Sequence, residues 1–416
     1  MSARKLGAAL SACALVVTLA GCGGSAPSGA AGAAAGRDDG PVKIGALHPV
    51  SGANAVDGQQ MRRGAQMAVQ AINAAGGVKS LGGRKIELLT GDTQGKAEVG
   101  QSEAQRLIAE GAVGLTGTYQ SAVSTNVAVV AERNRIPFVM DVTATDTIFA
   151  NGYDYAFRVQ PGSKAISSAG ARQLKQVADA AGKPVRKVAI LHEQSDFGSG
   201  AAEAFTAEAE KLGLPIGPNI SYDALTTSDL TAQVTQVKAS GADVLVVVGY
   251  YRDSLLAAKA VNAVKPELNA VWGVSNGAFD QPKFVQDAGP LGERFFSANY
   301  HHDAKNPQTA RLRADYQRRY GDPMRTGAVL AYDAIQVIAQ GVERAGATDP
   351  AKVRDGIRGS QVVPMAAGNG PIKFGPNGDN VNAATILMQV QGGQVKQVYP
   401  QEKAESQPNY SVTWRS

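Results

Sequence analysis

The chain has 416 residues, of which 44% are hydrophobic, and this length suits two globular domains better than one. Its 41 basic and 36 acidic residues give a formal net charge of +5. Basic residues alternate with acidic ones and form no stripe interleaved with aromatics, which argues against a nucleic-acid-binding protein. The two cysteines, Cys13 and Cys22, both precede residue 23. The rest of the chain therefore has no disulfide and no Cys-ligated metal.

The four histidines do not predict a metal site. They are His48, His192, His301 and His302, and only the last two are neighbours. Adjacent side chains on a strand point to opposite faces, so even this pair is unsuited to share one ion. We expect hydrogen-bonded or solvated imidazoles, no metal and no cofactor.

The first residues have the features of an export signal. Arg4 and Lys5 precede an apolar stretch over 6–19 that is too short for a comfortable membrane span. Leu19-Ala20-Gly21-Cys22 then resembles the lipobox of bacterial lipoprotein signals. The resemblance implies that 1–21 is a lipoprotein signal peptide and that the Cys22 thiol is acylated after cleavage. An ordinary secretory signal with an incidental cysteine is the alternative.

Residues 22–40 are expected to form the acylated cysteine and a flexible linker. The linker is rich in Gly, Ala and Ser, a composition that cannot build a core. Such a tether holds the following domain on the order of 20 Å from the bilayer. We therefore expect an extracytoplasmic, lipid-anchored protein that acts on something outside the cytoplasm.

From Pro41 onward, short apolar strands alternate with amphipathic helices, which predicts βαβ units on a parallel sheet. Asp57 and Gln60 form a D-x-x-Q pattern that predicts a helix N-terminus at Asp57. The expected strands of this first series are 42–47, 85–89, 112–115 and 137–140, and the expected helices are 57–75, 96–110 and 121–134.

A second series of the same kind begins after residue 159, so the sequence predicts an α/β protein of two lobes. Its expected strands are 187–192, 216–222, 244–248 and 270–272, and its expected helices are 200–212, 229–240 and 255–264. Two helices at 307–320 and 326–345 follow, and strands at 371–374, 385–391 and 394–398 form a hairpin tail. A ligand site is expected at the carboxyl ends of the strands, in the cleft between the lobes.

Several segments, in this order, are similar to the type I periplasmic binding proteins of the branched-chain amino-acid class. They are Val42-Lys43-Ile44-Gly45 with Pro49-Val50-Ser51-Gly52, Ala71 to Val78, Gly117-Thr118-Tyr119-Gln120-Ser121, Phe197-Gly198, Asp243 to Tyr250, and Ala331-Tyr332-Asp333-Ala334. The resemblance covers roughly residues 41–400.

The resemblance implies two Rossmann-like lobes with parallel sheets, joined by a three-crossover hinge. Lobe 1 would comprise 41–160 plus 301–374, and lobe 2 would comprise 161–300 plus 375–416. It also implies a monomeric substrate-binding protein that delivers a branched-chain or related amino acid to the permease of an ABC importer. Delivery of this kind is favoured over a signalling receptor built on the same fold.

Ser121 is the first candidate ligand residue. It opens a helix directly after a strand, where free backbone N–H groups and the helix dipole suit a carboxylate. A serine that only caps its helix is the alternative. The resemblance adds Thr143 and Thr145, which match positions that offer a carbonyl and a hydroxyl to the ligand; a plain polar loop is their alternative.

Five aromatic residues fall at or beside cleft positions of the family: Tyr119, Phe197, Tyr250, Tyr251 and Tyr332. Rings from both lobes could cover an apolar ligand body, although ordinary core or hinge packing would also explain them, Tyr332 above all. In the mechanism that the resemblance implies, the carboxylate binds at Ser121 and Thr145. Lobe 2 then closes over the ligand through Phe197, Tyr250 and the Ser275 loop.

One position departs from the family pattern. Amino-acid-binding members place Glu or Asp just after the strand that contains Trp272, where it pairs with the ligand ammonium; here Ser275 occupies that position. A hydroxyl holds a desolvated cation far less well than a carboxylate does. Either Asp57 takes over this role, or the ligand lacks an ammonium group, as an aromatic or aliphatic carboxylate or an amide would.

The sequence contains only weak indications of an enzyme. Gly273-Val274-Ser275-Asn276-Gly277 matches the G-x-S-x-G elbow of α/β-hydrolases, with Asp287, His301 and His302 later in the chain. The elbow needs a helix to start at once, which Pro282 makes doubtful, and no H-G-G-G loop precedes it. A secreted serine hydrolase using Ser275 is therefore a remote alternative, and binding without catalysis is expected.

Overall fold

The computed structural model describes residues 40–412 and 414. The expected signal peptide, the lipidation site Cys22 and most of the expected linker lie outside these residues. Within the described part of the chain, no helix is long and apolar enough to cross a membrane.

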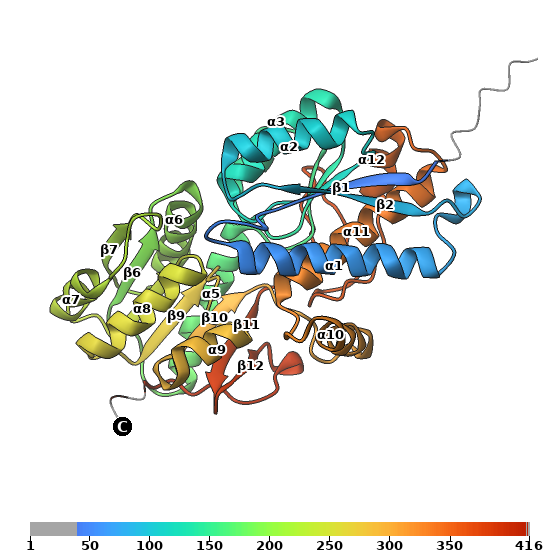
Figure 1. Ribbon diagram of the computed structural model, residues 1–416. Coiled ribbons are helices and arrows are strands. Elements are labelled where there is room, and N and C mark those ends of the chain that lie inside the picture. The colour runs from blue at the N-terminus through green and yellow to red at the C-terminus, as the bar shows by residue number, and fades with distance from the viewer. Residues whose placement is uncertain (1–39, 413, 415–416) are drawn as a thin grey trace, which may run out of the picture. The chain divides into compact units, whose positions relative to one another are not determined.

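The first sheet has five parallel strands in the order β2-β1-β3-β4-β5. They lie in the blue and teal half of Figure 1. Short buried strands suit this sheet because helices cover both of its faces. Their bounds are β1 Val42–His48, β2 Ile86–Asp92, β3 Leu115–Gly117, β4 Phe138–Met140 and β5 Ala156–Arg158.

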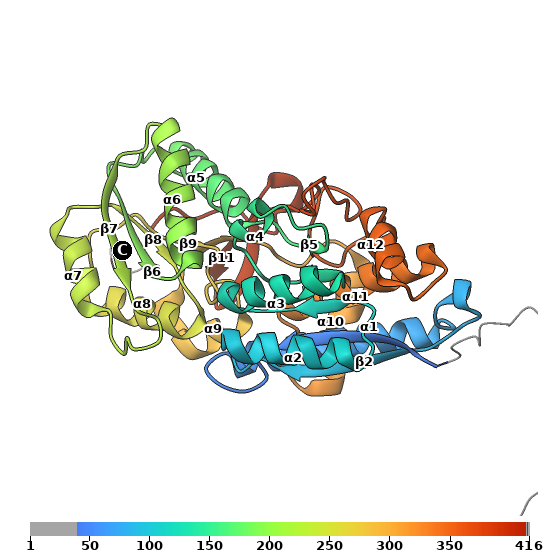
Figure 2. The same ribbon diagram turned by 90° about the horizontal axis from the view of Figure 1, so that it is seen from above.

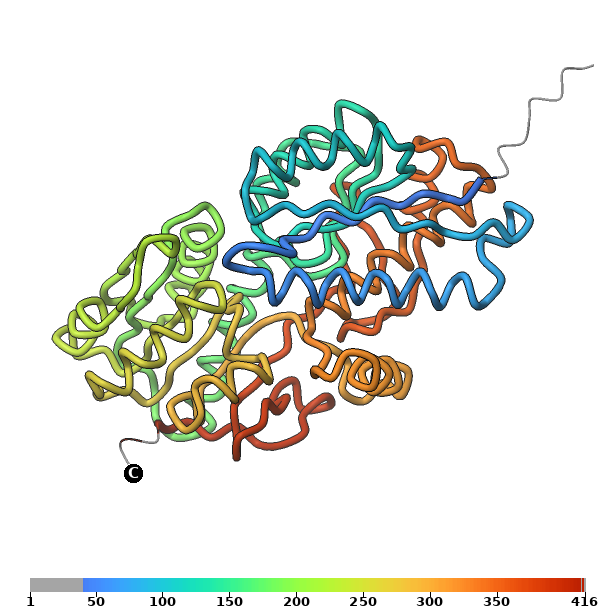
Figure 3. The backbone as a smooth tube through the Cα atoms, in the orientation of Figure 1, coloured from blue at the N-terminus to red at the C-terminus, as the bar shows by residue number. Residues whose placement is uncertain are grey.

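Helices from distant parts of the chain cover the first sheet. On one face, α1 (Ala55–Ala74) and α11 (Thr326–Ala345) share a hydrophobic core with β1, and the blue and orange helices run side by side in Figure 3. On the other face, α2 (Ala97–Ala109) and α3 (Ser121–Asn134) build a second core (Figure 2). Buried residues of α10 (Pro307–Tyr320) and α12 (Pro350–Arg358) join the first core.

The second sheet has seven strands in the order β12-β11-β10-β9-β8-β6-β7. The run β7-β6-β8-β9-β10 is parallel and repeats the order of the first sheet, and β11 and β12 add an antiparallel hairpin. The bounds are β6 Val188–Glu193, β7 Ile216–Tyr222, β8 Val244–Val248, β9 Ala270–Val274, β10 Phe296–Asn299, β11 Ile386–Gln391 and β12 Gln394–Tyr399.

Two helical layers cover the second sheet as well. Ile166 of α5 and Phe205 of α6 belong to the core on one face, and Val234 of α7, Ala257 of α8 and Phe284 of α9 belong to the core on the other. The bounds are α5 Ser163–Ala180, α6 Asp196–Lys211, α7 Thr231–Ala239, α8 Tyr251–Val264 and α9 Pro282–Ala288. The shortest helices are α4 Thr147–Ala150, η1 Lys79–Leu81, η2 Gly289–Gly292 and η3 Gln401–Lys403.

The two doubly wound series predicted from the sequence are confirmed, with α3, α10 and α11 ending at the expected residues. The sequence did not predict α5, α9, α12, β5 or β10. Pro282 occupies the first turn of α9, where proline needs no N–H partner and its fixed φ suits the helix. The expected strand 371–374 is wrong: it is reduced to an isolated bridge between Phe374 and Asn380.

The expected capping role of Asp57 is also wrong. Helix α1 begins at Ala55 after Asn54, so Asp57 lies inside its first turn. Gln60, the other half of the expected pattern, accepts a hydrogen bond from the Arg325 backbone N–H and donates to the Pro323 carbonyl. Both side chains therefore connect α1 to the start of α11 rather than to the backbone of their own helix.

The chain passes between the sheets after β5, after β10 and before β11. On the last passage, Asp379 forms a bridge with Arg158 of β5, and the Asn380 side chain donates to the Val159 carbonyl at 2.8 Å. The segment around residue 379 therefore still lies against the first sheet. The lobe limits 41–160 plus 301–374 and 161–300 plus 375–416 stay a proposal.

Candidate ligand-binding site

A small cavity lies where strands of both sheets end. Its volume is about 30 Å³. Each lining residue follows the carboxyl end of a strand, as expected for a doubly wound sheet. The lining residues are Tyr119, Ser121, Val142, Ala144, Phe197, Gly249, Tyr250, Ser275, Gly277 and Tyr300.

Three aromatic rings close this cavity across the lobes. The ring centroids of Tyr119 and Tyr250 are 5.9 Å apart, and those of Phe197 and Tyr250 are 5.2 Å apart, both pairs tilted. Such tilted pairs at this spacing attract one another. A cavity of about 30 Å³ offers room for about two water molecules. A ligand of amino-acid size therefore needs the lobes or the rings to move apart.

Ser121 is the first residue of α3 and is buried. The first backbone bond of this helix runs from the Ser124 N–H to the Gln120 carbonyl at 3.0 Å, so the N–H groups of residues 121–123 precede it. Free N–H groups at a helix N-terminus attract an anion. The position suits one carboxylate at the lobe 1 wall of the cavity.

Among the described residues that line this cavity, none has an acidic or basic side chain. Burial raises the pKa of Tyr119, Tyr250 and Tyr300, and the nearby carboxylates of Glu193 and Asp253 raise the pKa of Tyr250 further. The phenols therefore keep their protons at neutral pH and act as hydrogen-bonding groups. The cavity is polar in places but uncharged.

Ser275 has an unusual backbone conformation, with φ at +48°. This left-handed region is costly for most residues other than Gly, Asn and Asp, and strain of this kind is concentrated at functional sites. Its side chain is 7% exposed, and its Oγ has no hydrogen-bond partner within the described chain. A buried, unpaired hydroxyl at the cavity wall is available to a ligand.

The hydrolase alternative gains no support from the geometry around Ser275. Asp287 pairs with Lys283 at 2.5 Å and accepts from the Tyr251 hydroxyl, and His301 Nδ1 lies 3.1 Å from the Thr326 hydroxyl. In these contacts Asp287 and His301, the acid and base of the supposed triad, interact with residues other than Ser275. Helix α9 begins seven residues after Ser275 rather than at once.

The two candidate threonines lie beside the cavity, not on its wall. The Thr143 hydroxyl contacts Ser124 Oγ and donates to the Thr118 carbonyl at 3.1 Å, inside lobe 1. The Thr145 hydroxyl lies 3.0 Å from that of Thr147 and faces a separate groove beside α4 and α6. Their ligand-binding role stays a prediction that would require rearrangement on ligand binding.

Asp57 and Tyr332 are not among the residues that line the cavity. Asp57 pairs with Arg325 at 2.5 Å, with both side chains buried. Burial raises the pKa of Asp57, and the Arg325 charge opposes this effect. The Arg325 guanidinium also lies 5.2 Å from the centre of the Tyr251 ring, so it connects α11 to α8. Tyr332 and Gln336 of α11 line a separate groove.

Tyr300 is the main residue that sequence reasoning missed. It follows β10 directly, and it packs against cores of both lobes. Tyr250 and Ser275 were candidates through the family resemblance, whereas Tyr300 could have been found only by predicting β10 and expecting ligand residues at the carboxyl ends of the strands. Val142, Ala144, Gly249 and Gly277 give no such signal, because small and aliphatic residues after a strand are common.

We expect Asp57→Asn to lower the free energy of unfolding by about 3–5 kcal/mol, because it leaves the buried Arg325 charge without its partner. Urea unfolding followed by circular dichroism measures this. Asp315→Asn, which removes an exposed pair with Arg318, should cost no more than about 1 kcal/mol. If Asp57→Asn instead kept full stability and lost affinity only for ammonium ligands, Asp57 would be a ligand residue.

Comparisons with known proteins agree with this geometry. A family model described as a periplasmic binding protein matches residues 41–394. Leu/Ile/Val-binding protein homolog 8 of Brucella abortus is 30% identical over 374 residues, which span 87% of this chain and 91% of that protein. Homolog 7 of Brucella suis is 29% identical over 388 residues, spanning 91% and 95%.

Solved structures share the fold. The leucine binding protein LivK of Thermotoga maritima has a TM-score of 0.76 at 23% identity, covering 86% of this chain and 98% of its own. LivJ of Streptococcus pneumoniae, in complex with isoleucine, has a TM-score of 0.76 at 21% identity, covering 86% and 100%. A solute binding protein of R. palustris, in complex with benzoate, has a TM-score of 0.74 at 21% identity, covering 86% and 95%.

With its two doubly wound lobes, its interlobe cavity and a family match over most of its length, the chain belongs to the periplasmic binding protein family, of the branched-chain amino-acid ABC transporter type.

Proposed function

We propose that the chain is the extracytoplasmic receptor of an ABC importer, and that it carries a small carboxylate with an apolar body and no ammonium group. The observation that supports this most directly is the lining of the interlobe cavity, which combines a helix N-terminus with aromatic rings and no acidic side chain.

The carboxylate would bind at the start of α3. The N–H groups of residues 121–123 and the Ser121 hydroxyl offer several donors in a buried position, where charge-assisted hydrogen bonds are strong. Tyr119, Phe197 and Tyr250 would enclose the rest of the ligand, and burial of an apolar body against these rings is favourable.

The proposal that the ligand has no ammonium group rests on the residues near the aromatic rings of the cavity. Ser275 stands there with an unpaired neutral hydroxyl, and Asp57 is held by Arg325. Burying an ammonium group without an acidic partner is costly. An aromatic or aliphatic monocarboxylate, or an amide, avoids this cost, and the benzoate complex of the R. palustris protein shows that this fold accepts such a ligand.

A branched-chain amino acid is the second candidate. The names of the Brucella relatives favour it, and the faces of Tyr119, Phe197, Tyr250 and Tyr300 could attract an ammonium group through their quadrupoles. In both cases the protein binds without catalysis or cofactor. The closed form of a monomer would then deliver its ligand to the permease.

Lipid anchoring through Cys22 is part of the proposal. We expect the wild-type chain to fractionate with membranes in a bacterial host that processes lipoproteins, and Cys22→Ser to be found in the soluble extracytoplasmic fraction, because the acylated thiol is lost. Cys13→Ser is the matched control and should stay with the membranes. Soluble wild-type protein would show that the signal is an ordinary secretory one.

The ligand class is tested by a thermal-shift screen of the purified chain against benzoate, hexanoate, benzamide, L-leucine and L-isoleucine. A ligand at one hundred times its Kd should add about 2.7 kcal/mol of stability. We expect the carboxylates to stabilise the chain more than the amino acids, and Ser121→Ala to weaken carboxylate binding about 10–100-fold. Ser102→Ala, on the exposed face of α2, should change nothing. Stabilisation by amino acids alone would favour the second candidate.

Ser275→Asp should change the ligand preference, because it supplies the missing carboxylate at a position whose left-handed backbone Asp tolerates. Benzoate affinity should fall at least about tenfold, through repulsion between two carboxylates, and L-isoleucine affinity should rise. Calorimetric titration of both ligands measures the change. Unaltered preference in a folded Ser275→Asp variant would mean that Ser275 does not face the ligand.

A further inference from the structure

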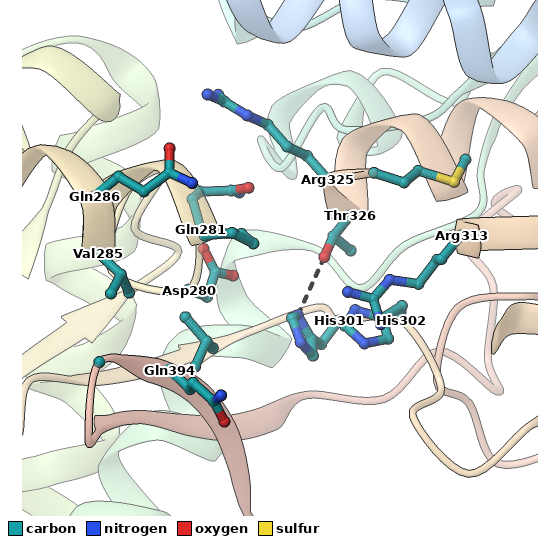
Figure 4. A pocket seen from close by; sticks show the side chains of 14 residues that line it. Asp280, Gln281, Val285, Gln286, His301, His302, Arg313, Arg325, Thr326 and Gln394 are labelled. Atoms are coloured by element: carbon teal, nitrogen blue, oxygen red, sulfur yellow. Dashed lines mark hydrogen bonds between the residues drawn. The ribbon is translucent and has the colours of Figure 1, made fainter. Parts of the chain in front are cut away.

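A second and much larger cavity lies on the hinge side of the lobes, with a volume of about 320 Å³. Its walls come from α9 and the β11–β12 turn on one side and from α10 and the start of α11 on the other (Figure 4). It shares no lining residue with the interlobe cavity. Its volume lies within the range of small-molecule sites.

One wall of this cavity offers buried acceptors without partners. Asp280 is 1% exposed, and its Oδ1 has no hydrogen bond within the described chain, while Oδ2 accepts from Asn299 at 3.3 Å. Gln281, the next residue, is 8% exposed, and its Oε1 is also unpaired. Leaving such buried groups unsatisfied is costly, so they point to a binding partner.

The opposite wall offers a cation. Arg313 of α10 lies beside His301 and His302 in Figure 4, and its buried Nε has no partner within the described residues. Burial and the Arg313 charge lower the pKa of His301 to about 3, and burial lowers that of His302. Both imidazoles are therefore neutral at pH 7. Arg325, at the rim, is already paired with Asp57.

The two walls have complementary charges. Burial raises the pKa of Asp280 to about 7, so an ammonium group placed beside it would favour the carboxylate form. Val285, Met324 and Val395 provide apolar surface between the polar walls. A ligand with an ammonium group at one end and a carboxylate at the other would satisfy the unpaired groups of both walls.

We propose that this hinge-side cavity is a second binding site, for a small zwitterion whose ammonium group contacts Asp280 and Gln281 and whose carboxylate contacts Arg313. Charged side chains line this site, whereas none lines the interlobe cavity among the described residues. The inference does not depend on the proposed function, because the two sites share no residue.

Isothermal titration of the purified chain tests the site with probes of increasing charge separation: glycine, 4-aminobutyrate and 6-aminohexanoate. Hexanoate and hexylammonium are the matched single-charge probes. We expect one of the zwitterions to bind at least about tenfold more tightly than either single-charge probe, because only it satisfies both walls. Arg313→Gln and Asp280→Asn should each weaken that binding about 10–100-fold.

Two further variants show which of the two cavities the probe occupies. Gln394→Trp, at an exposed position on the rim, should block the site without disturbing a buried contact. Ser121→Ala, in the interlobe cavity, should leave zwitterion binding unchanged. No binding of any zwitterion up to about 10 mM would overturn the proposal. Binding that survives Gln394→Trp and is lost with Ser121→Ala would also overturn it, because the probe would then occupy the interlobe cavity.

Discussion

The ion pair of Arg158 with Asp379 joins two of the three passages of the chain between the lobes. Arg158 is the last residue of β5 and is 1% exposed. Its guanidinium donates to the carbonyls of Ala144 and Thr145 at 2.8 Å each, and it pairs with Asp146 at 2.7 Å and Asp379 at 2.6 Å. The Arg158 side chain thus holds Ala144, which lines the interlobe cavity, together with the two residues that follow it. It also holds the segment around Asp379, where the chain passes between the sheets for the last time. An arginine suits this position because its five donors can serve several acceptors at once.

The two cavities differ in the charge of the residues that line them. The interlobe cavity is lined by rings, small residues and hydroxyls, and its neighbouring charges are neutralised by partners such as Arg325 for Asp57. In the hinge-side cavity, one carboxylate oxygen of Asp280 and the Nε of Arg313 have no hydrogen-bond partner among the described residues. Because desolvating a charge is costly, the interlobe cavity, which offers a helix N-terminus but no acidic lining residue within the described chain, favours a carboxylate over an ammonium group. The hinge-side cavity, with Asp280 on one wall and Arg313 on the other, favours a ligand that carries both charges.

Much of the fold and part of the site could be predicted from the sequence. Alternating strands and helices predicted both sheets apart from β5 and β10. The family resemblance gave Tyr119, Ser121, Phe197, Tyr250 and Ser275 as candidate ligand residues, and all five line one cavity. The rest depended on long-range packing. The partner of Asp57 lies 268 residues away, and the Thr143 hydroxyl faces Ser124 rather than the cavity. No local pattern encodes either contact.

The position of α11 has a consequence for how the protein matures. This helix forms the core of the first lobe with α1 and β1, yet it follows the whole parallel part of the second sheet in the chain. A chain that emerges from its N-terminus therefore cannot complete the first lobe until residue 345 is out, and until then the apolar face of β1 lacks the part of its cover that α11 provides. The second lobe likewise waits for β11 and β12. Both lobes are thus completed only near the end of the chain, and a first lobe made without α11 would expose its core to aggregation.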